Sequence, residues 1–368
     1  MRIAKLNDIG ELKTGPFGTQ FSASEYVSEG IPVINVKNIG YGSIIETGLD
    51  HVSKNTLGRL SEHKLKEGDI VFGRKGSVDR HCLIRREQNG WMQGSDCIRV
   101  RLTDTSVYPE FVSYYLLTDA VKMKINNSAV GSTMASLNTD ILGDIDIILP
   151  DYAEQKSIAL TLGIIDKKIK NNNRINDYLH QMAYAEYMHM FYGKTPNAKL
   201  GDVIIEHPKS FVQVSEAKEQ FGNIPFFTSG ESIYRWTESF VSDRSIFLNT
   251  GGNADVKFYV GNAAYSTDTW CISGINNLSD YVYLMLRSIK LELDQKFFQG
   301  TGLKHLQKPL LKDRMIYVPT NIELDTFNAD IQPRLSMISD NIRASEKLTT
   351  LRDWLLPMLM NGQATIKD

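Results

Sequence analysis

Two hydrophobic patterns alternate along the chain. Short apolar runs broken by glycine-rich turns, such as "IPVINV", "GDIVF" and "DCIRVRL" and later "SIFL", "VKFYV" and "TWCIS", predict β-strands. Apolar residues three and four positions apart predict one helix after each group of strands, beginning at Pro109 and at Ser279. The pattern therefore predicts two mixed globular parts, each built from short strands and a helix.

The longest helical pattern follows residue 150. Asp151 can cap a helix, and apolar residues from Ile158 to Ile169 recur with alternating steps of four and three, which is typical of a coiled-coil seam. Asn172 and Asn176 then occupy seam positions. Because a buried asparagine lowers stability but fixes register, these residues favour a helix whose pairing matters.

A second seam lies near the end of the chain. We predict that its helix begins at Pro333, where proline costs no hydrogen bond, and that Pro357 and Gly362 end it. Each long helix would then have about 22 to 25 residues and a length of about 35 Å. The apolar positions of the second seam include Leu335, Ile338, Ile342, Leu348, Leu351 and Leu355.

The chain contains one unit twice. At an offset of 169 residues, "GSTMASLNTDILGDIDIILP" from Gly131 aligns with "GTGLKHLQKPLLKDRMIYVP" from Gly300, and the register continues to Asn172 and Asn341. Upstream, the copies align only with changing offsets, as in "AKLNDI" and "AKLGDV". A period this long indicates a duplicated domain rather than a solenoid, with a divergent globular part and a constant helical tail.

These patterns predict an α+β fold with two mixed α/β domains, at residues 1–150 and 194–319. Two long antiparallel coiled-coil helices, within residues 151–193 and 320–368, would join them with approximate two-fold symmetry. The alternative is a helical hairpin that only stabilises two repeated domains. The polar seam favours a spacer of defined length, matched to DNA readers that place equivalent elements about one helical turn, or 34 Å, apart.

Composition is that of an ordinary globular chain, with 42% hydrophobic and 23% charged residues. The start, "MRIAKLNDIG", lacks a secretory signal, so we expect a cytoplasmic protein without a membrane partner. Cys82, Cys97 and Cys271 form no CxxC pair and are interpreted as small buried hydrophobes. The seven histidines form no HExxH motif, so the sequence supports no metal site.

The net charge of −2 excludes a protein that coats nucleic acid by bulk attraction. Basic residues are concentrated locally, because residues 70–101 contain seven basic and three acidic side chains. Arg74 and Lys75 follow a predicted strand in "GDIVFGRKGSV", where arginine could read guanine and lysine could hold phosphate. A solvated turn is the equally weighted alternative.

The second copy replaces this loop with "FLNTGGNADVKFYVGN", whose asparagines could pair with adenine but equally suit a turn. The small residues of "GSTMASLN" and "GTGLKHLQ" could hold a phosphate, or could only start the next element. The predicted DNA-contacting residues are Lys13, Gln20, Lys37, Arg74, Lys75, Ser77, Arg80, Gln93, Ser95, Ser132, Thr133, Ser229, Asn249, Asn253, Lys257, Thr267, Thr301 and Lys304.

Over essentially its whole length, the chain resembles the DNA-specificity subunits of type I restriction-modification systems. The segments that carry the resemblance are "KLNDIGELKTGPFG", "GIPVINVKNI", "GDIVFGRKGSV", "GSTMASLN" and, most specifically, "LPDYAEQKSIALTLGIIDKKI" with "LHQMAYAEYMHMFYG". The resemblance implies two target-recognition domains that read a split site on double-stranded DNA. It also implies spacer helices that dock two methyltransferase subunits through Glu154, Gln155, Ile158 and Ile165, and through Glu323 in the second copy.

The second copy departs from this pattern, with Leu324 in place of the glutamine and Pro333 inside the helix, which puts equal docking by both copies in doubt. The sequence does not decide whether restriction (motor) subunits join.

We expect no enzyme activity in the chain itself. It has neither the adjacent prolines of an Asn-Pro-Pro-Tyr methyltransferase motif nor a GxxxxGK[ST] loop, so S-adenosylmethionine, ATP and magnesium are expected only in partner subunits. A nuclease-like run, Asp151 with Glu154 and Lys156, crowds one helix start, where acidic caps are expected. The competing function is that of a stand-alone sequence-specific DNA-binding regulator or an anti-restriction protein.

Overall fold

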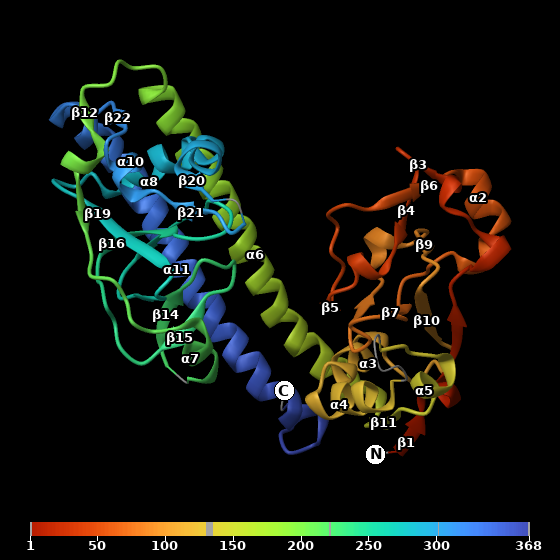
Figure 1. The fold of residues 1–368 in the computed structure, drawn as a ribbon. Helices are drawn as coiled ribbons and strands as arrows, with labels where there is room; N and C mark the ends of the chain where they lie inside the picture. The colour runs from red at the N-terminus through yellow and green to blue at the C-terminus, as the bar shows by residue number, and fades with distance from the viewer. Residues whose placement is uncertain (1, 130–134, 221, 301, 367–368) are drawn as a thin grey trace. The chain divides into compact units, whose positions relative to one another are not determined.

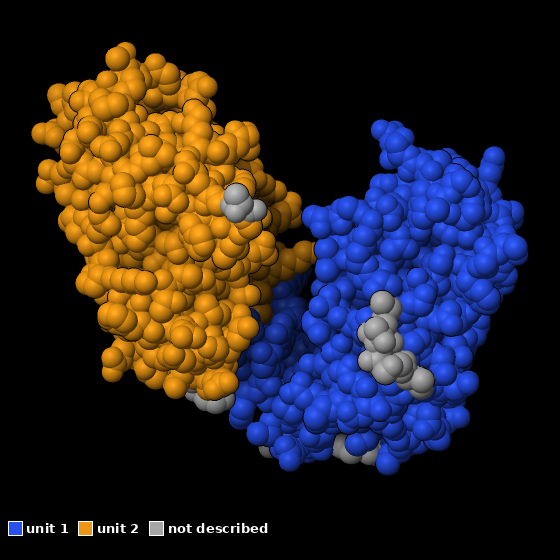
Figure 2. Space-filling model, in the orientation of Figure 1, with its two compact units in different colours: residues 1–167, 348–368 blue, residues 168–347 orange. Residues whose placement is uncertain are grey.

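The computed structural model describes residues 2–129, 135–220, 222–300 and 302–366. The chain forms two compact units (Figure 2). Unit 1 contains residues Met1–Lys167 and Leu348–Asp368, and unit 2 contains Lys168–Lys347. Two long helices, α6 (Tyr152–Phe191) and α11 (Asn321–Met360), each contribute residues to both units.

Unit 1 is built around two sheets that share its core. The five-stranded sheet has the order β2-β10-β7-β8-β5, and the four-stranded sheet has the order β3-β6-β4-β9. The bounds of the strands are β1 Arg2–Lys5, β2 Gly10–Thr14, β3 Tyr26–Val27, β4 Ile31–Ile34, β5 Tyr41–Gly42, β6 Asp50–Val52, β7 Ile70–Gly73, β8 His81–Leu83, β9 Met92–Gln93, β10 Cys97–Leu102 and β11 Asp146–Leu149. The helices are α1 Leu6–Ile9, α2 Lys54–Arg59, α3 Pro109–Leu116, α4 Asp119–Ser128 and α5 Thr139–Gly143.

Unit 2 repeats this plan with a sheet of order β13-β19-β16-β17 and a second of order β15-β14-β18 (Figure 1). Its strands are β12 Ala198–Lys199, β13 Ile204–Glu206, β14 Ile224–Phe227, β15 Tyr234–Trp236, β16 Arg244–Asn249, β17 Val256–Val260, β18 Ala264–Tyr265, β19 Thr269–Gly274, β20 Phe298–Gln299, β21 His305–Leu306 and β22 Met315–Ile316. Its helices are α7 Val214–Glu219, α8 Ser279–Ser288, α9 Lys290–Glu292, a π-helix at Leu293–Phe297, and α10 Lys308–Lys312.

The duplication predicted from the sequence is confirmed by strand register. Ala4 lies opposite Ile147 in the pairing of β1 with β11, and Ala198 lies opposite Ile316 in the pairing of β12 with β22. In both copies the neighbouring lysine forms an ion pair with the aspartate that follows the short helix, Lys5 with Asp144 and Lys199 with Asp313. The constant tail is therefore fastened to the start of its own divergent domain in the same way twice.

The long helices are longer than predicted. Each has 40 residues, or about 60 Å at 1.5 Å per residue. The prediction that the second helix begins at Pro333 is wrong, because α11 begins at Asn321 and continues through both Pro333 and Pro357. An interior proline costs about 3 kcal/mol. Upstream of Pro333, the buried Phe327 and Ile331 together offset that cost, since burying such a side chain contributes about 1.5–3 kcal/mol.

The two long helices run antiparallel within each unit. In unit 2, Asn172 donates to Ser345 Oγ at 3.1 Å, and Asn341 donates to Asn176 Oδ1 at 2.8 Å. Because the partner number on α11 falls as the number on α6 rises, the directions are opposite. The predicted polar seam positions Asn172 and Asn176 are both buried.

Unit 1 shows the same direction of pairing. There, Asp166 of α6 accepts from Arg352 of α11 at 3.0 Å and from Tyr114 Oη of α3 at 2.6 Å. Leu359 and Met360, near the end of α11, are buried in the core of unit 1. The last turns of the second helical tail therefore complete the first unit.

Some local predictions differ from the structure. The single helix expected from Pro109 is two helices, because Thr118 bonds its hydroxyl back to the carbonyl of Tyr115 at 2.7 Å and starts α4. Leu351 is 44% exposed and lies off the seam to which it was assigned. Cys82, Cys97 and Cys271 are buried free thiols, as predicted. Among the described residues, no helix combines the length and hydropathy needed to cross a membrane.

Candidate nucleic-acid interface

Three loops meet beyond the ends of β7 and β10 in unit 1. The backbone N–H of Arg74 donates to the carbonyl of Asp96 at 2.8 Å, and that of Leu137 donates to the carbonyl of Arg74, also at 2.8 Å. Gly76 adopts a φ of +80°, which favours glycine, and its N–H donates to Ala135 at 3.1 Å. We call residues 74–76, 94–96 and 135–137 the first loop joint.

Unit 2 builds the same joint from its own copies of these segments. The N–H of Thr250 donates to Asp268 at 3.0 Å, and that of Leu306 donates to Thr250 at 3.0 Å. Gly252, with a φ of +77°, donates to Lys304 at 3.0 Å. Residues 250–252, 266–268 and 304–306 form the second loop joint.

The joints explain why "GSTMASLN" and "GTGLKHLQ" recur with the same spacing. Their described residues supply the third strand-like segment of each joint, with isolated bridges between Lys75 and Ser136 and between Gly251 and His305. Ser132, Thr133 and Thr301, for which phosphate contacts were predicted, lie outside the described residues. The described residues of the two segments pair through their backbones.

The first loop joint carries the basic side chains that the sequence singled out. Lys75 is exposed and lies 3.2 Å from Asp96. Arg74 is half-buried, and its Nε is a buried donor that bonds no atom among the described residues. Arg80 places its guanidinium 5.4 Å from the ring centre of Tyr41, with Lys122 Nζ 5.6 Å from the same ring.

Tyr41 and Lys122 were missed by the sequence reasoning. Tyr41 is 51% exposed at the edge strand β5, and two cations lie 5.4 and 5.6 Å from its ring centre beside the loop that follows β7. An isolated tyrosine before a glycine gives little signal in the sequence, because only the parallel pairing of β5 with β8 brings it to the basic loop.

Other predicted contacts are engaged in intramolecular ion pairs. Lys13 lies 2.5 Å from Glu62, Lys37 lies 2.8 Å from Asp50, and Lys304 lies 2.9 Å from Asp294. Exposed ion pairs of this kind are worth little, so phosphate groups could compete for the lysines. Gln20 and Ser77 are exposed, and Ser95 is half-buried.

The placement of two predicted residues argues against DNA contact. Gln93 is fully buried and donates to the carbonyls of Lys13 and Cys97 at 2.8 and 3.1 Å. Asn249 is buried and donates to the carbonyls of Ser229 and Asn253. Both amides donate to backbone carbonyls inside their own unit, as most buried polar side chains do.

The remaining residues of the second copy are partly engaged. Lys257 Nζ donates to the carbonyls of Thr228 and Gly230, and burial lowers the pKa of this lysine. The hydroxyl of Ser229 donates to the carbonyl of Asp268. Thr267 is half-buried, while Asn253 is exposed. The second loop joint contains one lysine, Lys304, whereas the first contains Arg74 and Lys75, so the second presents less positive charge.

The residues expected to dock partners are largely internal. Gln155 is 1% exposed, accepts from the N–H of Tyr108 at 2.9 Å and donates to Pro150 at 2.9 Å. Ile158 and Ile165 are buried as well. Gln155 and Ile158 fasten α6 to the rest of unit 1, and the burial of all three residues argues against an external docking surface formed by them.

The two acidic docking candidates lie at helix starts. Asp151 caps α6 by accepting from the N–H of Glu154 at 2.9 Å, as its position predicts, and Glu154 is half-buried. Glu323 pairs with Lys194 and accepts from Thr320 and Tyr317, and these contacts, the lysine first, lower its pKa to about 2. Capping explains these acids without a nuclease role, and no cluster of metal-ligating side chains occurs among the described residues.

The outer face of α6 carries apolar side chains that the sequence reasoning did not assign. In unit 2, Ile175, Tyr178 and Met182 are 41%, 51% and 51% exposed, and their spacing of three and four places them on one face. In unit 1, Leu160 and Ile164 are 51% and 68% exposed on the same helix. We call Ile175, Tyr178 and Met182 the α6 stripe.

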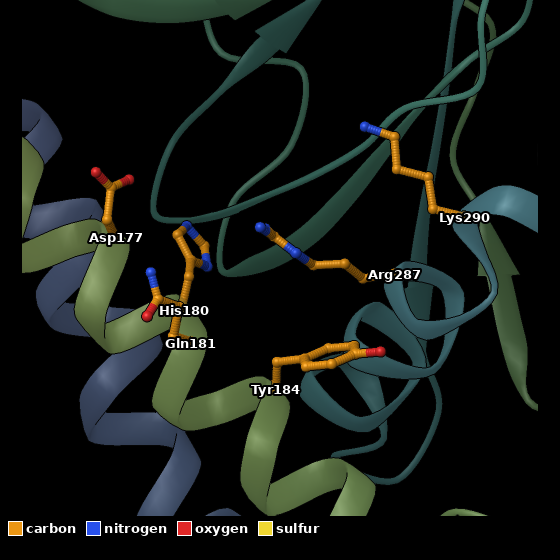
Figure 3. Close-up of a pocket in the computed structure, with 6 residues that line it drawn as sticks. All are labelled: Asp177, His180, Gln181, Tyr184, Arg287 and Lys290. Atoms are coloured by element: carbon orange, nitrogen blue, oxygen red, sulfur yellow. The ribbon is translucent and has the colours of Figure 1, made fainter. Parts of the chain in front are cut away.

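A hollow of about 450 Å³ lies between α6 and the end of α8 in unit 2 (Figure 3). Figure 3 shows the guanidinium of Arg287 directed toward the imidazole of His180. Burial and this nearby charge lower the pKa of His180 to about 4, so the ring is neutral at pH 7. Lys290, at the rim, pairs with Asp255 at 2.7 Å. The lining residues include none of the predicted DNA contacts.

Comparisons with known proteins agree with this architecture. Residues 1–181 match the family model described as the type I restriction modification DNA specificity domain. The specificity subunit of the type I restriction enzyme MjaIX from Methanocaldococcus jannaschii is 22% identical, over 100% of this chain and 94% of that protein. The MjaVIII specificity subunit of the same organism is 23% identical over 46% of this chain and 40% of its own length.

Among solved structures, the S subunit of a type I restriction-modification system from M. genitalium has the same fold. It aligns with a TM-score of 0.65 at 16% identity, over 97% of this chain and 95% of that chain.

Proposed function

The chain belongs to the family of type I restriction-modification specificity subunits, and on this premise we propose that it reads a split DNA site, one half through each loop joint. The observation that carries the proposal is the duplicated joint, in which three loops meet by the same backbone bonds in two units with different side chains. A common backbone with different side chains suits two readers of unlike half-sites.

The charge of the first loop joint supports contact with a duplex. Lys75 and Arg80 lie on the loop between β7 and β8, and Lys122 lies beside the same exposed tyrosine. The ion pairs of Lys75 with Asp96 and of Lys122 with Asp119 are solvent-exposed, so exchange of a carboxylate for a phosphate costs little. With a net charge of −2, the chain attracts DNA at such local sites rather than over its whole surface.

The helices α6 and α11 supply two further functions in this proposal. Their buried asparagines fix the register of the helix pair, which suits a spacer that sets the gap between half-sites. The α6 stripe is exposed apolar surface of the kind that protein partners cover, and methyltransferase subunits are the proposed partners.

Chemistry is assigned to those partners. We expect methylation, with S-adenosylmethionine, and any ATP-dependent step to reside in other subunits of a complex in the cytoplasm. The acids at the start of α6 and α11 act as helix caps, which accounts for their positions without a catalytic role.

The test is to assemble the chain with a methyltransferase of the Asn-Pro-Pro-Tyr type and to map methylated positions on DNA. A methylated split sequence with a fixed unread gap is the expected result. Tight binding of the purified chain alone to one short unsplit site would instead favour a stand-alone regulator. An anti-restriction protein would reduce methylation by a resident complex rather than direct it.

A further inference from the structure

Each unit presents one exposed phenylalanine at the same place in the repeat. Phe17 is 59% exposed and Phe211 is 89% exposed. Each lies 11 residues after the matching leucines, Leu6 and Leu200, which are both fully buried. This region of the copies is divergent in sequence, yet both retain a large apolar side chain that is mostly exposed.

The backbone around each phenylalanine is fastened down, so the exposure is built in. Gly15 and Pro16 are buried before Phe17, and the backbone at Gly15 is so close to Gly94 that a Cβ there would lie 1.9 Å from the Gly94 oxygen. Ser210 is buried before Phe211, and its hydroxyl accepts from the N–H of Val212 at 3.1 Å. Both rings therefore leave a fixed turn toward solvent.

Each fixed turn contacts the loop joint of its own unit. Gly15 packs on the segment 94–96 of the first joint. In unit 2, the carbonyl of Val212 accepts from the N–H of Thr267 at 3.0 Å, and Thr267 belongs to the second joint. The rings thus lie beside the same two surfaces that carry the proposed DNA contacts.

We propose that Phe17 and Phe211 are apolar base-contacting residues, each placing its ring against thymine methyl groups in the half-site read by its own unit. The inference rests on the proposed function. Phenylalanine can contact the thymine methyl group in the major groove, which is the one apolar feature that distinguishes a base edge there. Retention in both units beside both joints favours DNA over a protein partner, because the apolar stripe that would suit a partner lies on α6.

The experiment uses the complex with methyltransferase subunits and duplexes in which the two half-sites are varied separately. Phe17→Ala is expected to weaken binding through the first half-site by about tenfold to a hundredfold, the equivalent of burying one aromatic side chain, and Phe211→Ala to do so through the second. Replacing thymine by deoxyuridine at the contacted position should weaken the wild type and leave the alanine variant unchanged.

Matched controls are Met123→Ala in unit 1 and Leu291→Ala in unit 2, which remove apolar side chains that are 59% and 72% exposed on α4 and α9. Both should bind as the wild type. If either alanine variant unfolds, Phe17→Leu and Phe211→Leu keep the apolar volume and should show a smaller loss confined to the same half-site.

Several results would overturn the inference. Wild-type affinity of both alanine variants would do so, as would equal losses at both half-sites. Loss of methyltransferase assembly with DNA reading intact would show that the rings bind a protein instead. A wild-type complex that prefers no split site would refute the proposed function itself, so the two failures are distinguishable.

Discussion

Lengthening the paired helices by a whole number of DNA turns is the most direct test of the spacer. Inserts of 21 residues would be placed in α6 between Asn172 and Asn176 and in α11 between Asn341 and Ser345. Three heptads return the seam to the same face, so both polar pairs can form again on either side of the inserts. The inserts would be copied from seam residues of the same helices.

The expected change in the site follows from helix geometry. At 1.5 Å per residue, 21 residues add about 31.5 Å, close to the 34 Å turn of B-DNA. The same grooves would then face the two loop joints again, with a gap longer by about nine or ten base pairs. A single heptad adds only about 10.5 Å, which corresponds to roughly three base pairs and turns the groove by about 100°.

The assay is selection from a duplex library in which the half-sites are constant and the gap is random. The three-heptad variant should select the same half-sites with the longer gap, and the one-heptad variant should bind every gap more weakly than the wild type. If the three-heptad variant folds, assembles and still selects the original gap, the helices do not measure the site.

Three further predictions concern single positions. Lys75→Ala should weaken binding through the first half-site. It should also reduce the slope of log affinity against log salt concentration by about 0.9, measured by titration at several salt concentrations. An unchanged slope would exclude a phosphate contact. Asn341→Ala should lower the free energy of unfolding by about 1–3 kcal/mol, because it leaves the buried Oδ1 of Asn176 without its donor. Replacing both asparagines by leucine should be nearly neutral. Urea unfolding that shows the same loss of stability for the single and the double variant would contradict this. Burial lowers the pKa of His81 to about 4 from an ordinary value of 6.5, so the unfolded chain binds a proton first and stability should fall as pH drops from 6.5 toward 4. His81 alone should contribute roughly 2 kcal/mol of the loss between pH 7 and pH 5, and His81→Gln should remove that contribution.

Much of the fold could be predicted because the two copies of the repeated unit keep the same spacing between matching residues. The offset of 169 residues that aligns Asn172 with Asn341 also aligns β11 with β22, and each of these strands pairs with the first strand of its own copy. Strands with continuous apolar runs, such as β7 and β16, were located correctly because those runs are buried.

The start of α11 could not be predicted from local rules. Proline is favoured at a helix start, and that preference placed the boundary at Pro333. What moves the boundary to Asn321 is the burial of Phe327 and Ile331 against the rest of unit 2, which is a tertiary effect. The sequence also does not indicate that the side chains of Gln93 and Gln155 donate to backbone carbonyls inside the protein.

The candidate site was predicted only in part. The basic loop at Arg74 and Lys75 was found because it directly follows a predicted strand. Phe17 and Phe211 could also have been found from the sequence, since both lie 11 residues after the matching leucines. A single identical residue is easily overlooked, however, where the two copies align only with changing offsets. Only their exposure distinguishes them from core aromatics.

Burial of Leu359 and Met360 in unit 1 has a consequence for how the protein is made. Unit 2 is one continuous segment, Lys168–Lys347, whereas unit 1 also needs Leu348–Asp368. During synthesis, residues 348–368, which complete unit 1, leave the ribosome last, after the whole of unit 2. A nascent chain that stops before residue 348 would thus carry a complete second half and an open first one, a state that invites chaperones or proteases.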